Sequence, residues 1–377
     1  MLEDVLYLSK KLIKLPSISP LDLGCQKILS KRLQKIGFFI ENIKINNTNN
    51  LWAYKGQGGK TLTFLGHTDV VPPGNINDWK TDPFYPIIKD NFLFGRGSAD
   101  MKCSLSAMIV ATESFLKNFT NFNGRISFLI TSDEESFGHD GTKKIIKILK
   151  NRNEKIDYCL VGEPTSDVHV GDVIKNGRRG SISAKIIFYG VQGHIAYPHL
   201  ATNPIHNSLY AIKNFVNLKL DLGNNFFQPS SLQIFYISSG NKNITNMIPG
   251  SMKVGLNIRY STEISKEIIV MKIKKILDKC SLKYEINWIF SGKPFITNSG
   301  FLLETVQKSI FQVNKFFPKL STSGGTSDGR FLTCMNSEII ELGLVNKTIH
   351  KANECVNIND LYKLSKIYIN ILKNLFI

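Results

Sequence analysis

The chain has 377 residues, of which 42% are hydrophobic and 20% are charged, so it is long enough to fold as two domains and is not a disordered protein. The net charge of +17 allows nucleic-acid binding as a class, but the lysines are spread along surface-helix patterns and no basic cluster with interleaved aromatic residues is found, which argues against it. The apolar runs are shorter than a membrane span, and we expect no secretory signal at the N-terminus.

The first part of the chain alternates between helical and extended patterns. The apolar spacing predicts, in chain order, a helix over 1–15, a helix from Asp22 to Gly37, strands over 38–45, 51–54 and 61–65, a loop over 71–90, a helix over 101–117, a strand over 125–131, a helix over 140–150 and a strand over 156–161. This alternation predicts an α/β fold with a mostly parallel mixed sheet flanked by helices.

The pattern changes near residue 180. Strands over 181–189 and 252–260 alternate apolar and polar residues, which is typical of an antiparallel sheet with one wet face. The remaining predicted elements are helices over 203–218, 263–279, 299–315 and 358–376, a loop over 321–329 and a strand over 338–342. We therefore predict a discontinuous α/β domain over 1–179 and 294–377, interrupted by an inserted α+β domain over 180–293.

Acidic residues and a histidine follow three of the predicted strands. His67 and Asp69 come after the strand at 61–65, Glu134 and Glu135 come after the strand at 125–131, and Glu163 comes after the strand at 156–161. The carboxyl ends of parallel strands meet at one edge of a sheet, where ligands bind. We therefore expect these side chains to lie close together.

Together with Asp100 and the late His350, these residues form a set typical of a metal site. Three protein ligands and an open water position describe a catalytic zinc site, and one carboxylate can bridge two ions. Glu134 and Glu135 are neighbours, so one can bind metal while the other takes a proton from water. Two simpler interpretations stay open from the residues alone: Asp100 can cap the helix that follows it, and the acidic run 133–135 can be a solvated loop.

Four motifs follow one another in order along the chain. They are Leu-Gly-His-Thr-Asp-Val-Val-Pro over 65–72, Gly-Arg-Gly-Ser-Ala-Asp-Met-Lys over 95–102, Thr-Ser-Asp-Glu-Glu over 131–135 and Gly-Glu-Pro-Thr over 162–165. In type and spacing they resemble the signatures of the aminoacylase/acetylornithine deacetylase/carboxypeptidase family of co-catalytic zinc hydrolases. The resemblance extends over nearly the whole chain and makes 1–179 with 294–377 the expected catalytic domain.

The resemblance implies two Zn²⁺ ions per subunit, with Co²⁺ able to substitute at one site. It assigns one ion to His67 and Glu163, the other ion to Glu135 and His350, and the bridge between them to Asp100. It further implies that Asp69 orients His67 and that Glu134 is the general acid/base.

By the same resemblance, the inserted domain dimerises. His194 would then reach into the site of a partner subunit and stabilise an oxyanion. Without the resemblance, the favoured interpretation of His194 is a histidine packed at a loop.

Three further stretches, 175–181, 321–331 and 345–350, resemble one branch of the family, whose substrate is an N-succinylated diamino acid with three carboxylates. Arg178 and Arg259 are the matching guanidinium positions, because arginine binds carboxylates in a bidentate way. The other matching polar contacts are Ser181, Asn246, Gly325, Thr326 and Asn346. Deacetylation of acetylornithine or of another N-acyl-amino acid is the alternative with the same chemistry.

The chain also contains a formal match to a serine-hydrolase motif, which we do not expect to be functional. Gly-Thr-Ser-Asp-Gly over 325–329 matches G-x-S-x-G, but residues 315–324 lack the buried strand that this motif requires, so we do not expect Ser327 to be a nucleophile. The six cysteines are scattered without a C-x-x-C pair, which favours a cytoplasmic protein without disulfides. The expected partners are a small-molecule substrate and a second copy of the chain, and neither nucleic acid nor membrane.

Overall fold

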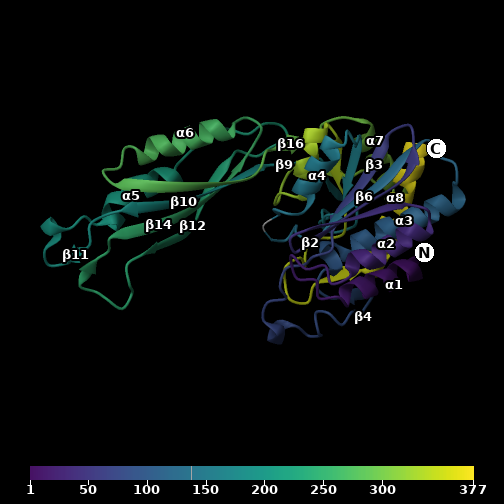
Figure 1. The fold of residues 1–377 in the computed structure, drawn as a ribbon, viewed down its shortest axis with the longest axis horizontal. Helices are drawn as coiled ribbons and strands as arrows, with labels where there is room; N and C mark the ends of the chain where they lie inside the picture. Colours follow the sequence, from purple (N-terminus) through teal and green to yellow (C-terminus); the bar gives the residue numbers. More distant parts are fainter. Residues whose placement is uncertain (137) are drawn as a thin grey trace. The chain divides into compact units, whose positions relative to one another are not determined.

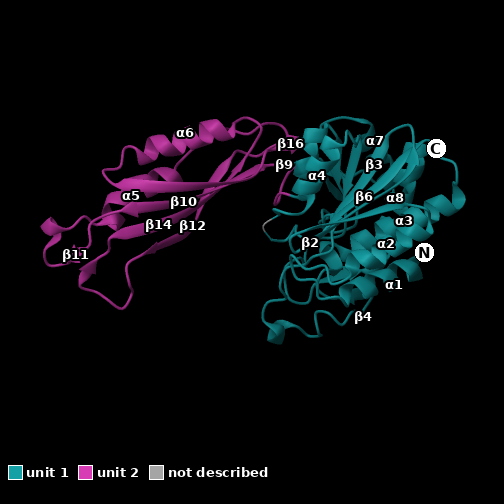
Figure 2. Ribbon diagram, viewed as in Figure 1, with its two compact units in different colours: residues 1–177, 296–321, 327–377 teal, residues 178–295, 322–326 magenta. Residues whose placement is uncertain are grey.

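The computed structural model describes residues 1–136 and 138–377 and divides the chain into two compact units (Figures 1 and 2). Unit 1 comprises Met1–Gly177, Ile296–Ser321 and Ser327–Ile377, and unit 2 comprises Arg178–Phe295 and Thr322–Thr326. The predicted boundaries lie within about two residues of these limits, except that the prediction placed 322–326 in the first domain. This short segment belongs to unit 2 because Thr322 Oγ1 donates to Phe226 O and Arg178 Nη1 donates to Ser323 O.

Unit 1 is built on an eight-stranded mixed sheet with the order β1-β2-β6-β3-β7-β18-β8-β17. Its strands are β1 Phe39–Ile45, β2 Thr48–Gln57, β3 Thr61–His67, β6 Gly124–Thr131, β7 Tyr158–Val161, β8 Val173–Lys175, β17 Lys319–Ser321 and β18 Glu338–Glu341. The central strands β6, β3, β7 and β18 are parallel, while β1, β2 and β6 pair antiparallel. The predicted class, a mostly parallel mixed sheet flanked by helices, is confirmed.

Helices cover both faces of this sheet (Figure 1). They are α1 Leu2–Ile13, α2 Cys25–Lys35, α3 Cys103–Asn118, α4 Thr142–Asn151, α7 Phe301–Asn314 and α8 Ile358–Phe376, together with the 3-10 helix η4 Asp328–Met335. The helices α1, α2, α3, α7 and α8 share one apolar core with the sheet, in which Phe64 stacks on Phe128 and meets the edge of Tyr368. The helices α4 and η4 contact each other and the sheet on its other face. Every residue of β3 is buried, so this strand lies at the centre of the unit.

The segment 71–90, predicted as a loop, contains two short elements. The 3-10 helix η1 spans Ile76–Asp78, and β4 Ile87–Lys89 pairs with β5 Phe92–Phe94. The turn between β4 and β5 is made by Asp90 and Asn91, which both have positive φ angles of 49° and 63°. Two residues of this kind favour the tight hairpin turn, and the period-two pattern is too short there to be recognised in the sequence. A third strand, β19 Cys355–Asn357, pairs with β5 from the far end of the chain.

Unit 2 has one four-stranded antiparallel sheet with helices packed on it. The sheet order is β12-β14-β10-β15, with β10 Gly180–Tyr189, β12 Ser231–Ser239, β14 Ser251–Tyr260 and β15 Lys283–Gly292. The helices α5 Pro204–Val216 and α6 Lys266–Leu277 contribute to its apolar core. The short pair of β11 Gly193–His194 with β13 Met247–Ile248 completes the strands of unit 2. The pair of β9 Gly177–Arg178 with β16 Phe295–Ile296 stands where the chain passes from unit 1 into unit 2 and back. Across the part of the chain that is described, no helix combines the length and the apolar composition needed to cross a bilayer.

Candidate metal centre

The parallel strands at the centre of unit 1 end beside one another. In β3, Leu65 lies opposite Leu129 of β6 and opposite Val161 of β7, and His67 lies opposite Thr131. The strand β6 ends at Thr131 and β7 ends at Val161, so the acidic residues that follow each strand emerge at the same edge as His67. The predicted convergence therefore follows from the strand register.

The imidazole of His67 is fixed by its own turn. Its Nδ1 lies 2.9 Å from the carbonyl oxygen of Asp69, which can only accept, so Nδ1 carries the proton. Its Nε2 then faces the acidic residues, at 3.2 Å from Asp100 Oδ1 and 3.6 Å from Glu163 Oε1. Nε2 is therefore the nitrogen of His67 that faces the candidate metal position.

Asp69 has more than one contact in this turn. Its carboxylate lies 3.6 Å from His67 Nδ1, and it accepts hydrogen bonds from the backbone N–H groups of Glu134 and Glu135, at 3.4 and 3.0 Å. The carboxylate therefore holds the acidic turn in place, and the backbone carbonyl of Asp69 makes the hydrogen bond that orients His67.

Asp100 lies between the two histidines that were predicted as ligands. Its Oδ1 lies 3.2 Å from His67 Nε2 and its Oδ2 lies 3.3 Å from His350 Nε2. The Nε2 of His350 also lies 3.1 Å from Glu135 Oε1. The simpler interpretation of Asp100 as a helix cap is wrong, because α3 begins at Cys103 and its N-cap position, Lys102, makes no side-chain capping bond.

The ligand atoms form two overlapping groups. One consists of His67, Asp100 and Glu135, and the other of His67, Glu134 and Glu163, and within each group the ligand atoms lie within 4.8 Å of one another. The two groups share His67, and Asp100 connects the first group to His350. The interpretation of 133–135 as a solvated loop is wrong, because Glu134 and Glu135 point into this cluster.

The electrostatics of the cluster fit a bound cation. Burial, and next the charge of a neighbouring carboxylate, raise the pKa values of Glu134 and Glu163 well above the usual value. Within the described residues, the buried Oε1 of Glu163 has no hydrogen-bond partner. Hydrogen bonds to Asp100 and Glu135 raise the pKa of His350 to about 10. Crowded carboxylates with an orphaned oxygen, mixed with imidazole nitrogens, are the donor set that zinc and similar divalent ions take in proteins.

Three residues that support the centre were not identified from the sequence. Glu354 accepts hydrogen bonds from the segment that carries Asp100, and Arg96 forms a buried ion pair with it at 2.8 Å. Lys102 is fully buried, and its Nζ donates to the carbonyl oxygens of Leu12, in the last turn of α1, and of Leu15, just after α1. Two features of the sequence could have indicated these residues: Arg96 stands between two glycines, and the carboxylate of Glu354 comes four residues after His350. Neither feature is informative until the structure shows that the two loops are in contact.

The predicted substrate residues lie on both units. Arg178, Ser181, Asn246, Arg259, Gly325 and Thr326 belong to unit 2, and Asn346 belongs to unit 1. Arg178 Nη1 donates to Ser323 O at 2.8 Å, and Ser181 lies opposite Arg259 in the β10–β14 pair. Gly324, with a φ of 97°, approaches Arg178 so closely that a Cβ atom would lie 2.7 Å from its Nη1.

His194 and Asn246 lie together at one end of unit 2. His194 of β11 pairs with Met247 of β13, and Ile195 N donates to Asn246 O at 3.0 Å. The His194 side chain is exposed, and its Nδ1 accepts from Ala196 N at 3.1 Å. This leaves Nε2 as the nitrogen that can reach another molecule.

Ser327 has a structural contact. It is buried, its Oγ donates to the buried Glu341, and the preceding strand β17 is short and largely exposed. The hydroxyl therefore anchors the start of η4 to β18, which is at odds with a nucleophile on a buried strand-to-helix turn.

Residues 63–374 match the sequence model of Peptidase family M20/M25/M40. The succinyl-diaminopimelate desuccinylase of Buchnera aphidicola subsp. Acyrthosiphon pisum (strain APS) is 59% identical over 368 residues, which cover 98% of each chain. The enzyme of the same name from Buchnera aphidicola subsp. Cinara cedri (strain Cc) is 54% identical over 374 residues, which cover 99% of each chain.

The fold is similar to solved structures of metallopeptidases. The M20 family metallo-carboxypeptidase Sso-CP2 from Sulfolobus solfataricus superposes with a TM-score of 0.83 at 20% identity and covers 98% of each chain. YXEP from Bacillus subtilis, a dinuclear metal-binding peptidase from the M20 family, superposes with a TM-score of 0.70 at 11% identity, covering 98% of this chain and 97% of that chain. At these identities the likeness shows the fold.

Proposed function

Because the chain belongs to Peptidase family M20/M25/M40, we propose that it is a metal-dependent amide hydrolase that converts N-succinyl-LL-2,6-diaminopimelate and water to succinate and LL-2,6-diaminopimelate. The product serves lysine and diaminopimelate biosynthesis. The observation that carries the proposal is the convergence of two histidines and four carboxylates at one edge of the sheet. The substrate is supported by relatives of that name at 54% and 59% identity over almost the whole chain.

The residues present fit a pair of divalent ions, for which we propose zinc, with cobalt accepted at one position. His67 and Glu163 would hold one ion, and Glu135 and His350 would hold the other. Asp100 suits the bridging role because each of its two oxygens faces a different histidine. When bound, the ions polarise the amide carbonyl and make the attacking water acidic enough to lose its proton near neutral pH.

The protein's own groups complete the reaction. A Glu134 carboxylate oxygen takes the proton from the water and delivers it to the departing amine nitrogen, so that the same side chain serves as base and then as acid. A buried site suits this task, because burial raises the pKa of Glu134 and stabilises the form that holds the proton. Asp69 holds the backbone of the acidic turn from which Glu134 projects.

A second copy of the chain would complete the site. His194 Nε2 of the second copy would donate to the oxygen that gains negative charge as the amide carbon is attacked. This role is supported by the exposure of His194 and by the engagement of its Nδ1 with Ala196 N. The active form is then a homodimer, and the scattered, unpaired cysteines suit a reducing cytoplasm.

Substrate carboxylates would be bound by the two arginines of unit 2. Arg178 and Arg259 provide planar guanidinium groups for this purpose. The supporting polar contacts would come from Ser181, Asn246, Gly325, Thr326 and Asn346.

A comparison of substrates tests the proposal. For the zinc-loaded protein, kcat/KM should be far higher for N-succinyl-LL-2,6-diaminopimelate than for N-acetylornithine. A clear preference for acetylornithine would overturn the substrate while leaving the metal centre in place. Absence of hydrolysis of any N-acyl-amino acid by protein with two bound ions would overturn the activity itself.

A further inference from the structure

The buried carboxylate of Glu354 receives four hydrogen bonds from a single short segment. Its Oε1 accepts from the backbone N–H groups of Ala99 and Asp100, at 2.8 and 3.1 Å. Its Oε2 accepts from the N–H of Gly97 at 3.0 Å and from Nη1 of Arg96 at 2.8 Å. The backbone carbonyl of Glu354 also accepts from Gly95 N at 2.9 Å. One residue therefore holds the whole stretch 95–100.

The stretch requires such an acceptor because its backbone is irregular. Asp100 has φ −123° and ψ 94°, and Met101 has φ −133° and ψ 28°, so neither residue continues the helical ladder into α3. Buried N–H groups outside regular structure need other acceptors, and Glu354 supplies them for three residues. Gly97 enters the stretch with a φ of 81°, and a Cβ atom there would lie 2.6 Å from Val70 Cγ1. This conformation is what directs Asp100 at both histidines.

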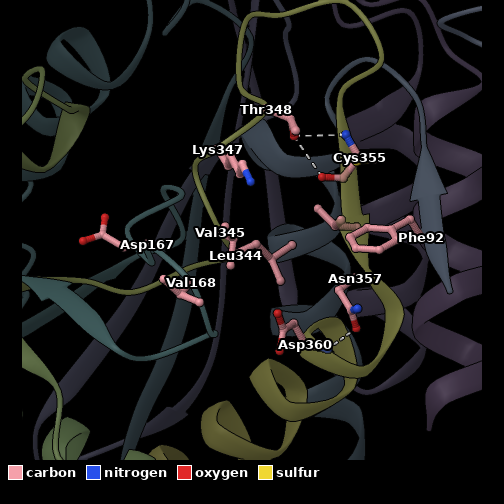
Figure 3. A pocket seen from close by; sticks show the side chains of 11 residues that line it. Phe92, Asp167, Val168, Leu344, Val345, Lys347, Thr348, Cys355, Asn357 and Asp360 are labelled. Carbon is pink, nitrogen blue, oxygen red and sulfur yellow. Dashed lines mark hydrogen bonds between the residues drawn. The ribbon is translucent and has the colours of Figure 1, made fainter. Parts of the chain in front are cut away.

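Glu354 is also tied to the second histidine. It lies four residues after His350 in a loop whose base is closed by Thr348, whose Oγ1 donates to Cys355 O at 3.0 Å and accepts from Cys355 N at 3.1 Å (Figure 3). Arg96 Nη1 reaches the same loop by donating to Lys351 O at 3.1 Å. The loop that presents His350 is thus fixed to the segment that presents Asp100, and Glu354 makes most of the connection.

We propose that Glu354 is a positioning residue of the metal centre, which holds the backbone of Asp100 and sets its distance to His350 before any ion binds. The inference rests on the proposed function in one respect, namely that Asp100 and His350 are metal ligands. Partners of this kind behind the ligands typically change metal affinity or activity by about 10–100-fold when they are removed. If the buried ion pair of Glu354 with Arg96 served stability alone, its removal would change neither the affinity for metal nor the spectrum of the bound ion.

The matched variants are Glu354→Gln and Asp172→Asn. Glutamine keeps the shape of Glu354, but its NH₂ group takes the place of one accepting oxygen. That NH₂ group, which can only donate, then faces two other hydrogen-bond donors. Asp172 is the control because its carboxylate also binds three backbone N–H groups of unit 1, those of Asp167, Val168 and His169, at 2.9, 2.7 and 3.0 Å.

Metal-stripped proteins are titrated with Co²⁺ and followed by visible absorption. We expect Glu354→Gln to bind one Co²⁺ about 10–100-fold more weakly with altered absorption bands, and Asp172→Asn to match the wild type within about twofold. After zinc loading, kcat of Glu354→Gln should fall by a similar factor while KM stays within about twofold. If Glu354→Gln shows the wild-type isotherm and spectrum and only melts at lower temperature, the positioning role is refuted.

A measurement on the wild type guards against a variant that does not fold. In the metal-free protein, hydrogen exchange of peptides covering 95–102 should already be slow, because the Glu354 carboxylate engages these N–H groups without metal. Fast exchange that becomes slow only when Zn²⁺ is added would overturn the proposal. Neither Co²⁺ binding nor hydrogen exchange involves the substrate. A wild type that binds two ions without hydrolysing the succinylated substrate would therefore refute the proposed function and leave this inference standing.

Discussion

Exchanging Glu134 or Glu135 for glutamine tests the proposal that Glu134 carries the proton and that Glu135 is a metal ligand. The two residues are adjacent, yet they belong to different groups of ligand atoms: Glu135 lies with His67 and Asp100, and Glu134 lies with His67 and Glu163. Only Glu135 also contacts His350, at 3.1 Å. Because the acidic turn is held through backbone N–H groups bound to Asp69, glutamine at either position leaves the turn in place.

The expected magnitudes differ between the two changes. Glu134→Gln removes the group that we propose takes and returns a proton, and such groups contribute about 10²–10⁴-fold to the rate. A loss of roughly 10³–10⁴ in kcat corresponds to about 4–5.5 kcal/mol of transition-state stabilisation, with both ions retained. Glu135→Gln replaces a proposed charged ligand by a neutral one, so the ion that we assign to Glu135 and His350 should be lost first, and activity should return in part when zinc is added in excess.

The assay combines metal content by atomic emission with steady-state kinetics on the succinylated substrate. Glu134→Ala is included, because it removes the side chain entirely and should also retain two ions while nearly abolishing turnover. Two outcomes would refute the reasoning. Full activity of Glu134→Ala would remove Glu134 from the mechanism, and loss of an ion from Glu134→Gln with full retention in Glu135→Gln would exchange the two roles.

Further predictions concern the second copy, the core and acid stability. His194→Ala should lower kcat by about 10²–10³-fold with both ions retained, and mixing it with the inactive Glu134→Gln protein should restore about a quarter of wild-type turnover through mixed dimers, whereas no recovery would exclude a contribution across the dimer. Tyr368→Phe removes the buried hydroxyl that donates to Leu342 O at 2.6 Å and should cost about 1–3 kcal/mol in urea unfolding, with unchanged stability as the contrary result. Burial alone would raise the pKa of Asp221. Hydrogen bonds that its carboxylate accepts from its own loop and from the residue after β14 outweigh this effect, so the pKa is lowered. The wild type should therefore be more stable than Asp221→Asn above the ordinary carboxyl pKa, and the difference should vanish as the pH falls through the folded-state pKa; a pH-independent difference would contradict this.

Much of the candidate centre could be predicted from the sequence because the carboxyl ends of neighbouring parallel strands lie at the same edge of a sheet. His67 ends one strand of the sheet, and Glu135 and Glu163 each follow a neighbouring strand within a few residues, so the fold alone brings them together once the strands are assigned. Asp100 was ambiguous from the residues alone, since an acidic residue just before a helix is a common cap. The structure excludes the cap, because the backbone is irregular at Asp100 and Met101 and α3 begins only at Cys103, and no local sequence pattern predicts this irregularity.

The parts that could not be predicted depend on contacts with backbone atoms distant in sequence. Glu354 binds N–H groups that lie more than 250 positions earlier, and a backbone N–H has no residue type that a sequence can reveal. The same reason explains why 322–326 joins unit 2, since the hydrogen bond from Thr322 ends on the carbonyl of Phe226. The side chains that converge on the candidate centre lie in recognisable sequence motifs, whereas the partners of main-chain groups could not be recognised from the sequence.

The order of strands in unit 1 has a consequence for how the chain is made on the ribosome. The strand β18, Glu338–Glu341, lies between β7 and β8, and both of those strands are synthesised before unit 2 begins. The first 177 residues therefore emerge with the place between β7 and β8 still empty, and all of unit 2, including Thr322–Thr326, is synthesised before β18 can fill it. The residues that close it come from the last tenth or so of the chain, together with His350. A nascent chain that stalls before this point has an exposed sheet edge and a candidate metal centre that lacks His350, so we expect premature termination to yield an aggregation-prone fragment.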